Sequence, residues 1–388
     1  VSIADVPLTE LIDYACSDSD NALRLFPIFK AELQRLDMWE LYTDVELPLI
    51  PVLARMEEWG VGVDESYTEA LLKELVTEIA AARARCYATG LPASCDVGSN
   101  DQLAHTLEVL GAPITERTEA KHQLKTDEAS LVAAQLRGWR PALLQSILSY
   151  RQAIKLHSYV RNFLALRGKD GRLHPSIKQS ASPDEQDYTA RSAPATARLS
   201  YEAPNLQQVP HHGLPPDGLA DEEKANRIRR CLVARSGWSF VAGDMSQEEP
   251  RITAFVSGDP AMLADFAAGI PIYAPFGQAI YNKPVSKADV REWHVAKTAM
   301  LSAIYGSTYS KLLEIEPRLD QAGAEAAWAS IHDRYKRLFQ YGEEVKQFAG
   351  KHGFVRDYFQ RMRWLPAVFS NRPEEREAAY REAINDTV

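Results

Sequence analysis

The sequence predicts a helix-rich α+β protein with more than one domain. At 388 residues the chain exceeds the size of one ordinary hydrophobic core. Helical patterns occupy most of residues 1–166 and of residues 251–385. Strand signals are short and few, and the strongest of them is the apolar run at residues 238–242, which is read as a buried strand.

Composition and charge limit the classes of protein that fit. A hydrophobic content of 45% and a charged content of 25% are typical of soluble globular proteins. No apolar run approaches the length of a membrane helix, and the first residues do not resemble a signal peptide, so we expect a cytoplasmic protein without a membrane partner. The four cysteines show no C-x-x-C spacing, which favours reduced thiols over zinc or disulfides.

The net charge of −9 argues against an avid, non-specific nucleic-acid binder. Local clusters of arginine nevertheless occur at residues 227–230, 356–363 and 372–381. A groove lined by such clusters could follow phosphates while the remaining surface stays acidic. Solvated helix faces explain each cluster about equally well.

The first half of the chain is expected to be mainly helical. Residues 1–40 predict one or two amphipathic helices, and residues 41–145 are helix-rich. Gly60 is expected to end one helix, Asp64 to cap the next, and Ser99 to begin another. A further helix should end near Leu166.

Strand and turn signals then alternate. They occur at residues 172–176 and 180–188, and a loop rich in proline and glycine is expected at residues 211–221. From Lys224 the chain is expected to alternate toward the strand at residues 238–242. That strand would present Asp244 at its tip, and Pro250 would begin the following helix.

The second half predicts helices through Phe266, a break at residues 269–273 and a helix over about residues 287–305. Lys297, Leu301 and Tyr305 are spaced to share one face of that helix. Further helices should cover residues 320–351 and 374–385, with a short hairpin at residues 353–366 between them.

Asp244 and Lys297 together suggest a site for a charged, flat ligand. A carboxylate at a strand tip suits a hard divalent cation, and Mg²⁺ usually takes its remaining ligands from phosphates and water. A lysine opposite that carboxylate would neutralise the phosphates. A single aspartate after a strand more often caps a turn, so this reading depends on the surrounding motifs.

Four ordered segments carry a resemblance to a known family. Residues 241–251, V-A-G-D-M-S-Q-E-E-P-R, and 297–306, K-T-A-M-L-S-A-I-Y-G, resemble motifs A and B of the family A (polymerase I-like) DNA polymerases. T-A-R-L-S at residues 196–200, followed by N-L-Q-Q-V-P at 205–210, is similar to another element of that family. Residues 376–385 look like the helix that precedes its Q-G-T motif.

The resemblance implies a right-hand polymerase fold, with an antiparallel palm sheet and helical fingers and thumb. Residues 1–40 would be the C-terminal end of a 3′–5′ exonuclease-like domain, 41–145 the thumb and 146–257 the first part of the palm. Residues 258–350 would be the fingers, and 351–388 would return toward the palm. The implied activity is template-directed transfer of dNMP from a dNTP to a primer 3′-hydroxyl, with two Mg²⁺ ions, or Mn²⁺ in their place.

The resemblance also assigns roles to single residues. Asp244 and the Met245 carbonyl would bind metal, and Asp244 and Lys297 would be catalytic. The implied nucleotide-binding residues are Glu249, Tyr273, His294, Lys297, Leu301 and Tyr305. The implied primer-template contacts are Arg198, Asn205, Gln207, Arg251, Arg376, Arg381 and Asn385. Tyr14 and Asp18 would belong to the last exonuclease motif.

Several positions depart from the family pattern. Trp293 stands where the family has an arginine, with His294 on the Lys297 face as a substitute, and residues 271–273 keep only the Tyr of a D-x-[HY] motif. The family's usual Tyr, Gly and Gly are replaced here by Met245, Ala197 and Ser302. The Q-E-E-P-R run is closer to the phage members of the family. A phage origin would place the protein in the cytoplasm of a bacterial host.

The family's Q-G-T and H-D-E motifs would follow Val388. Because one carboxylate cannot hold two Mg²⁺ ions, we expect this chain to be inactive in nucleotide transfer unless another segment, or a second chain, completes the palm. The alternatives are a catalytically inactive module that binds primer-template DNA, one part of a split polymerase, and an exonuclease-related scaffold.

Overall fold

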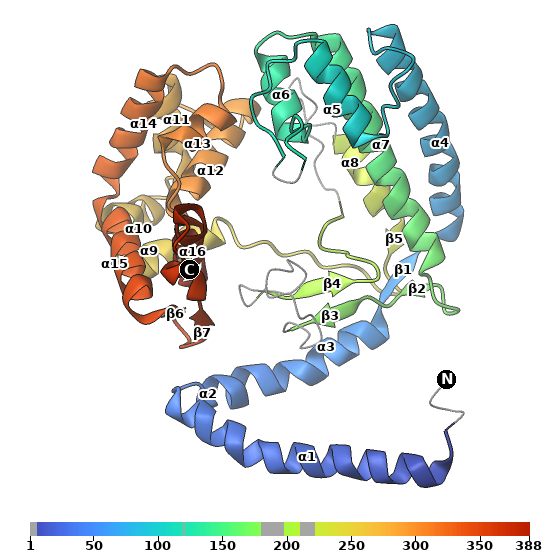
Figure 1. The fold of residues 1–388 in the computed structure, drawn as a ribbon, viewed down its shortest axis with the longest axis vertical. Coiled ribbons are helices and arrows are strands. Elements are labelled where there is room, and N and C mark those ends of the chain that lie inside the picture. Colours follow the sequence, from blue (N-terminus) through green and yellow to red (C-terminus); the bar gives the residue numbers. More distant parts are fainter. Residues whose placement is uncertain (1–5, 119–120, 180–197, 210–221) are drawn as a thin grey trace.

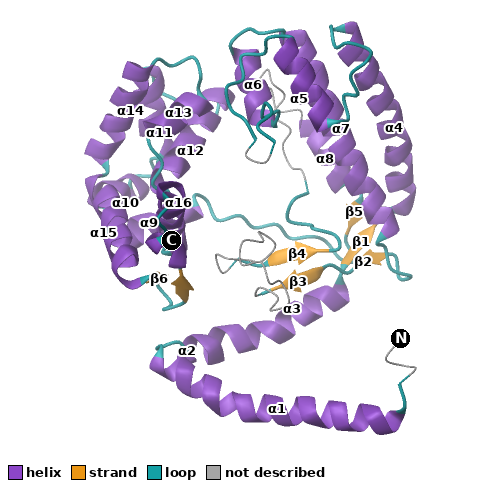
Figure 2. Cartoon of the chain, viewed as in Figure 1, coloured by secondary structure: helices purple, strands orange, loops and turns teal. Residues whose placement is uncertain are grey.

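The computed structural model describes residues 6–118, 121–179, 198–209 and 222–388. Two groups of helices stand apart, one formed by α4 to α8 and the other by α9 to α16, and a helical arm formed by α1 to α3 runs beneath them (Figure 1). Short strands and extended segments connect the groups (Figure 2). The chain is helix-rich with little sheet, as the sequence predicts.

The arm consists of α1 (Leu8–Arg35), α2 (Trp39–Leu41), the π-helix η2 (Tyr42–Glu46) and α3 (Leu47–Trp59). Gly60 ends α3 with a φ of 56°, a conformation that favours glycine. The arm contacts the C-terminal hairpin, because Arg361 pairs with Glu46 and Arg356 donates to the Leu36 carbonyl at 2.8 Å. The helical predictions for this region are confirmed.

The first helical group is formed by α4 (Glu65–Ala88), α5 (Asn100–Val109), α6 (Glu128–Leu136) and α7 (Pro141–Ala165). Asp64 caps α4 by accepting from the Tyr67 amide at 2.9 Å, and Ser99 caps α5 by accepting from the Gln102 amide at 3.4 Å. Both caps satisfy amides that a helix leaves unpaired at its start. The predicted start signals at Asp64 and Ser99 are confirmed.

The described residues form three small antiparallel sheets. β1 (Val61–Val63) lies between β2 (Arg172–Leu173) and β5 (Leu232–Val233), β3 (Ser176–Lys178) pairs with β4 (Ser200–Glu202), and β6 (Phe354–Arg356) pairs with β7 (Met362–Trp364). The strand signals near residue 172 and the predicted C-terminal hairpin are confirmed. The strand and turn signals at residues 180–188, the T-A-R run and the loop at residues 211–221 lie largely or wholly outside the described residues.

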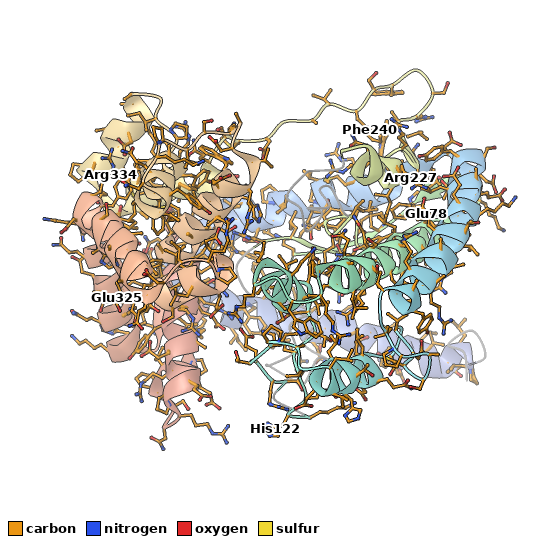
Figure 3. The ribbon with its side chains drawn as sticks, turned by 90° about the horizontal axis from the view of Figure 1, so that it is seen from above. Glu78, His122, Arg227, Phe240, Glu325 and Arg334 are labelled. Carbon is orange, nitrogen blue, oxygen red and sulfur yellow. The ribbon has the colours of Figure 1, made fainter. Side chains whose placement is uncertain are left out.

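The segment after Lys224 differs from the alternating pattern that was expected. It forms α8 (Glu222–Arg229) before β5. Arg227 of α8 pairs with Glu78 at 2.7 Å and with Glu74 at 2.8 Å, and Figure 3 shows Arg227 beside Glu78. This arginine therefore fastens α8 to α4 and is not free for phosphates.

The second helical group contains α9 (Glu248–Ser257), α10 (Pro260–Ala267), α11 (Tyr273–Tyr281), α12 (Val290–Ile304) and α13 (Tyr309–Ile315), followed by α14 (Gln321–Arg334) and α15 (Lys336–His352). After the hairpin come the short 3₁₀ helix η3 (Pro366–Phe369) and α16 (Pro373–Asp386). One apolar core, which includes Phe276, Met300 and Tyr335, joins α11, α12 and α15. The predicted helices over 287–305, 320–351 and 374–385 are confirmed within a few residues.

The predicted buried strand at residues 238–242 is wrong. This segment runs exposed between the two helical groups, Val241 is 96% exposed, and Phe240 projects from it (Figure 3). A strand requires a neighbouring backbone for its amides and carbonyls, and no strand in the described part of the chain pairs with it. Pro250 is the third residue of α9, where its missing N–H still costs no helical hydrogen bond.

The thiol prediction is confirmed in that Cys16, Cys86, Cys95 and Cys231 are all free. Cys16 is exposed, so only the other three are buried within the fold. Among the described helices, none is both long and apolar enough to cross a membrane.

Candidate active site

Asp244 and Lys297 line one pocket, with a volume of about 480 Å³, between the exposed segment before α9 and the face of α12. Arg251 of α9 and Tyr273 at the start of α11 also line it. Two further lining residues, Lys287 and Trp293, were not among the predicted ligand residues. The pocket therefore places one exposed carboxylate among several cations.

The turn after Asp244 is held in place from α9. Arg251 donates from Nε to the Ser246 carbonyl at 2.9 Å, and its guanidinium lies 4.6 Å from the centre of the Phe266 ring. Gln247 accepts from the Ile272 amide at 3.0 Å, which joins this turn to the loop before α11. Among the described residues, Arg251 thus contacts a backbone carbonyl and an aromatic ring.

Of the predicted residues on and after α12, Lys297 lines the first pocket, and Tyr305, the residue that follows the helix, lines the second. Desolvation by the surrounding protein lowers the pKa of His294 below its usual 6.5, and the nearby positive charge of Lys297 lowers it further. Trp293 packs edge-on against Tyr273 with ring centres 5.7 Å apart. The tryptophan at the place of the family arginine thus forms a wall of the pocket, and His294 remains the titratable group beside Lys297.

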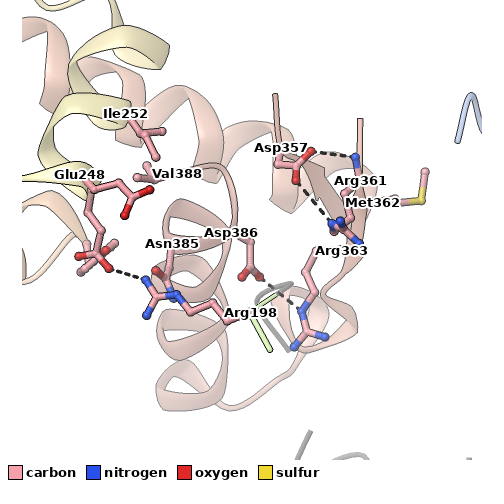
Figure 4. Close-up of a pocket in the computed structure, with 12 residues that line it drawn as sticks. Arg198, Glu248, Ile252, Asp357, Arg361, Met362, Arg363, Asn385, Asp386 and Val388 are labelled. Carbon is pink, nitrogen blue, oxygen red and sulfur yellow. Dashed lines mark hydrogen bonds and ion pairs between the residues drawn. The ribbon is translucent and has the colours of Figure 1, made fainter. Parts of the chain in front are cut away.

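Glu249 and Tyr305 line a second pocket, of about 410 Å³, whose lining residues are drawn in Figure 4. Arg198 forms an ion pair with Glu249 there, and Asn385 of α16 lines the same wall. Desolvation, followed by the adjacent Glu249 carboxylate, raises the pKa of Tyr305. Two predicted nucleotide residues and two predicted DNA residues therefore meet at this point.

A shallower hollow of about 590 Å³ continues from the second pocket toward α16. Arg198, Tyr305, Arg381 and Asn385 line it. Arg381 is exposed and has no ion-pair partner in the described part of the chain, whereas Arg376 donates to the Ser370 carbonyl at 3.3 Å. This surface could accept a polyanion through Arg381.

Asn205 and Gln207 hold the Arg198 segment in shape. Asn205 Oδ1 accepts from the Gln207 amide at 3.1 Å, and Gln207 Nε2 donates to the Leu199 carbonyl at 2.8 Å. The hydrogen bonds of both side chains are thus made within residues 199–207. Leu301 is partly buried against the apolar core that contains Met300.

Tyr14 and Asp18 are not brought to either pocket. Both are exposed on α1, within the arm beneath the two helical groups (Figure 1). The sequence also did not single out Glu248, Arg361, Arg363 and Asp386, which line the second pocket. The clustering of arginines at 356–363 was visible in the sequence, but their pairing with acids on other elements was not.

The donor groups fit a divalent ion only in part. Asp244 and the carbonyl of the next residue, Met245, are hard oxygen donors, and Asp244 shares its pocket with Lys287 and Lys297. This set suits one Mg²⁺ completed by phosphate and water. Within the described residues there is no group of three or more His, Cys, Asp or Glu side chains that could hold a metal. These residues alone do not supply ligands for two ions.

Known proteins resemble the chain over almost its whole length. It is 31% identical to DNA polymerase I of Chloroflexus aurantiacus, over 99% of this chain and 39% of that protein. It is 32% identical to the thermostable DNA polymerase I of Thermus aquaticus, over 90% of this chain and 39% of that protein. The chain thus spans about two fifths of the length of these relatives.

A solved structure also matches, the POL domain of Pol1 from M. smegmatis in complex with DNA primer-template and dNTP. The TM-score is 0.80 at 28% identity, covering 94% of this chain and 60% of that one. The fold is therefore the predicted right-hand polymerase fold. Since the model of the family described as DNA polymerase family A also matches residues 65–388, the chain belongs to the family A DNA polymerases.

Proposed function

We propose that this chain carries the nucleotide site and primer-terminus site of a template-directed DNA polymerase. The observation that carries the proposal is the shared pocket of Asp244 and Lys297, which brings a metal-binding carboxylate and a phosphate-binding cation to one cavity. The reaction would join a dNMP from a dNTP to the 3′-hydroxyl of a primer. The M. smegmatis domain, solved with primer-template and dNTP, supports this substrate class.

In this proposal the first pocket binds the triphosphate. Lys297 and Lys287 line it and are compact cations that would neutralise phosphate oxygens. His294 does not line the pocket but is close enough to Lys297 to feel its charge, so it would add positive charge nearby when it is protonated. Asp244 would hold Mg²⁺, which supplies charge neutralisation at the phosphates and activation of the attacking hydroxyl. The metal dependence of the family supports a divalent ion, and Mn²⁺ is the expected substitute.

The second pocket would receive the sugar and the primer end. Glu249 and Tyr305 would form the wall against the sugar, so that a 2′-hydroxyl meets a carboxylate held by Arg198. Arg198, Asn385 and Arg381 would contact the primer-template, with Arg376, Asn205 and Gln207 supporting their elements. Arg251 would act by fixing the turn that carries Asp244.

The subdivision that the family resemblance implies is part of this proposal. Residues 41–145 would be the thumb, 146–257 the first part of the palm, 258–350 the fingers and 351–388 the return to the palm. The exonuclease-like role of Tyr14 and Asp18 in residues 1–40, the phage-like origin, the cytoplasmic location and a second chain that completes the palm stay predictions.

Primer extension with Mg²⁺ and all four dNTPs tests the proposal, with Asp244→Asn as the control. Incorporation that requires Asp244 is the expected result for a complete palm. Primer-template binding with a steep salt dependence, but without incorporation, would instead favour the DNA-binding module. Absence of both DNA binding and Mg²⁺-dependent dNTP binding would refute the proposed function.

A further inference from the structure

Glu316 is a buried carboxylate that joins three helices of the second helical group. It directly follows the last residue of α13, and it is 1% exposed. Its Oε2 atom accepts from the hydroxyl of Tyr281, the last residue of α11, at 2.9 Å. Its Oε1 atom pairs at 3.5 Å with Arg291, in the first turn of α12. These three helices lie together at one end of the group (Figure 1).

Arg318 completes the surroundings of this carboxylate. It donates from Nε to Oε1 at 2.8 Å and from Nη2 to Oε2 at 2.7 Å. Desolvation by burial acts to raise the pKa of Glu316, but the hydrogen bonds from Arg318 and Tyr281 outweigh it, so the pKa lies below its usual value. Glu316 is therefore ionised at neutral pH, and it holds its neighbours through charge-assisted hydrogen bonds.

The two partners of Glu316 on α11 and α12 stand at either end of a loop, residues 282–289. Within the loop, Asp289 Oδ2 accepts from the Ser286 amide at 2.9 Å and from the Ser286 hydroxyl at 3.0 Å. Val285 is buried, and an added Cβ at Gly277 of α11 would lie only 2.8 Å from the Val285 Cβ. The loop is thus fixed at both ends and closely packed in its middle.

One side chain of this loop, Lys287, reaches the first pocket. It is exposed, and it has no ion-pair partner in the described part of the chain. Lys297 lines the same pocket from α12, whereas Arg251, its third cation, is engaged with the Ser246 carbonyl. The pocket therefore offers two lysines to phosphate oxygens, one from the loop and one from the helix.

We infer that Glu316 is a positioning residue for nucleotide binding, because it fixes the loop that presents Lys287 to the triphosphate. Glu316, Tyr281 and Arg291 do not line the first pocket, so Glu316 acts through Lys287 and does not touch the ligand. A loop that must be ordered when a ligand binds reduces the affinity, and a loop that is already held in place avoids this cost. The inference rests on the proposed function, which assigns the triphosphate to this pocket.

Equilibrium binding of dNTP to the full chain in the presence of Mg²⁺ tests the inference. Lys287→Ala should weaken binding by about tenfold, the effect of one hydrogen bond to a charged group. Glu316→Gln keeps the size of the side chain but removes its charge, and Tyr281→Phe removes only the hydroxyl that anchors one end of the loop. Both should weaken dNTP binding, by up to about tenfold, and leave the affinity for primer-template unchanged.

The Lys287→Ala background separates positioning from a general loss of structure. In that background Glu316→Gln and Tyr281→Phe should have little further effect on dNTP affinity, because they act through the lysine that is already absent.

Asp265→Asn is the matched control. Asp265 is also a buried acid held by an arginine and a tyrosine, since it accepts from Arg334 at 2.6 Å and from the Tyr335 hydroxyl at 2.7 Å. Neither partner belongs to the loop or to its two ends. This variant should therefore lose stability, as Glu316→Gln does, but keep its dNTP affinity.

Unchanged dNTP affinity in either Glu316→Gln or Tyr281→Phe would overturn the inference and leave the proposed function standing. Equal losses with and without Lys287, or a matching loss in Asp265→Asn, would overturn it too, because Glu316 would then only support the fold. Absence of Mg²⁺-dependent dNTP binding by the unmodified chain would overturn it together with the triphosphate assignment of the first pocket.

Discussion

Asp244 and Lys297 line the same pocket, although one lies on an exposed extended segment and the other on α12. Helices α9, α10 and α11 lie between them in the sequence. The turn contacts of Arg251 and Gln247 fix the first residue relative to the second. A metal-bound triphosphate is the ligand that we propose for these two groups.

Replacing Asp244 by Asn should remove a metal ligand without removing a DNA contact. In a polymerase with a completed palm, we expect Mg²⁺-dependent incorporation to fall by about 100-fold or more, the size seen when a charge-stabilising group is lost from an active site. Single-turnover extension and primer-template affinity, measured in parallel, check this. An equal loss of both quantities would count against the metal role.

Glu249→Ala should relax discrimination against ribonucleotides. The change removes the carboxylate beside Tyr305 and also frees Arg198 from its ion pair. Incorporation of rNTP relative to dNTP should rise by about tenfold or more, because an unpaired or repelled polar group costs this much selectivity. Glu249→Gln is the matched control, since it keeps the size of the side chain. Unchanged sugar selectivity in Glu249→Ala would remove this assignment.

Nucleotide affinity should depend on pH through His294. Its pKa lies below the usual 6.5, so the ring is neutral at pH 7 and gains a positive charge only as pH falls. We expect tighter dNTP binding at acidic pH in the unmodified chain and a flatter profile in His294→Gln. Equilibrium titrations across this range provide the measurement, and identical profiles would exclude His294 from the site.

The same group has the opposite effect on stability. The pKa of His294 in the folded protein is lower than its value of 6.5 in the unfolded chain. As pH falls below 6.5 the unfolded chain therefore binds more protons than the folded protein, and the free energy of unfolding decreases. The His294→Gln variant should therefore lose less stability on acidification than the unmodified chain. Urea unfolding at neutral and acidic pH measures the difference, which should vanish above neutral pH.

Asp259 should be a strong contributor to the stability of the second helical group. It is 1% exposed, and it accepts from the Ala261 and Met262 amides of α10 and from the Arg337 and Leu338 amides of α15. Asp259→Ala should cost about 2–4 kcal/mol, because two helix starts lose their cap.

Asp320→Ala provides the comparison for Asp259. Asp320 is exposed and caps only α14, through the Gly323 amide at 2.7 Å. Its loss should cost about 1 kcal/mol. Denaturant unfolding of both variants gives the two values, and similar costs would contradict the double role of Asp259.

The sequence predicted the elements whose signals are local. Helix starts at Asp64 and Ser99, and the helix end at Gly60, depend on residues within or next to one element. The apolar run at 238–242 was misread because hydrophobicity does not reveal whether a partner strand is present. Local patterns also did not predict the ion pairs of Arg227 with Glu78 and of Arg363 with Asp386, because each pair joins segments that are distant in the sequence.

The most direct test of the central claim is a double-mutant cycle on Mg²⁺-dependent dNTP affinity, with Asp244→Asn and Lys297→Ala singly and together. If both groups hold one metal-bound triphosphate, the losses should be strongly non-additive, and the double variant should bind hardly more weakly than either single one. Additive losses, or an affinity in Asp244→Asn that still responds fully to Mg²⁺, would contradict the shared site.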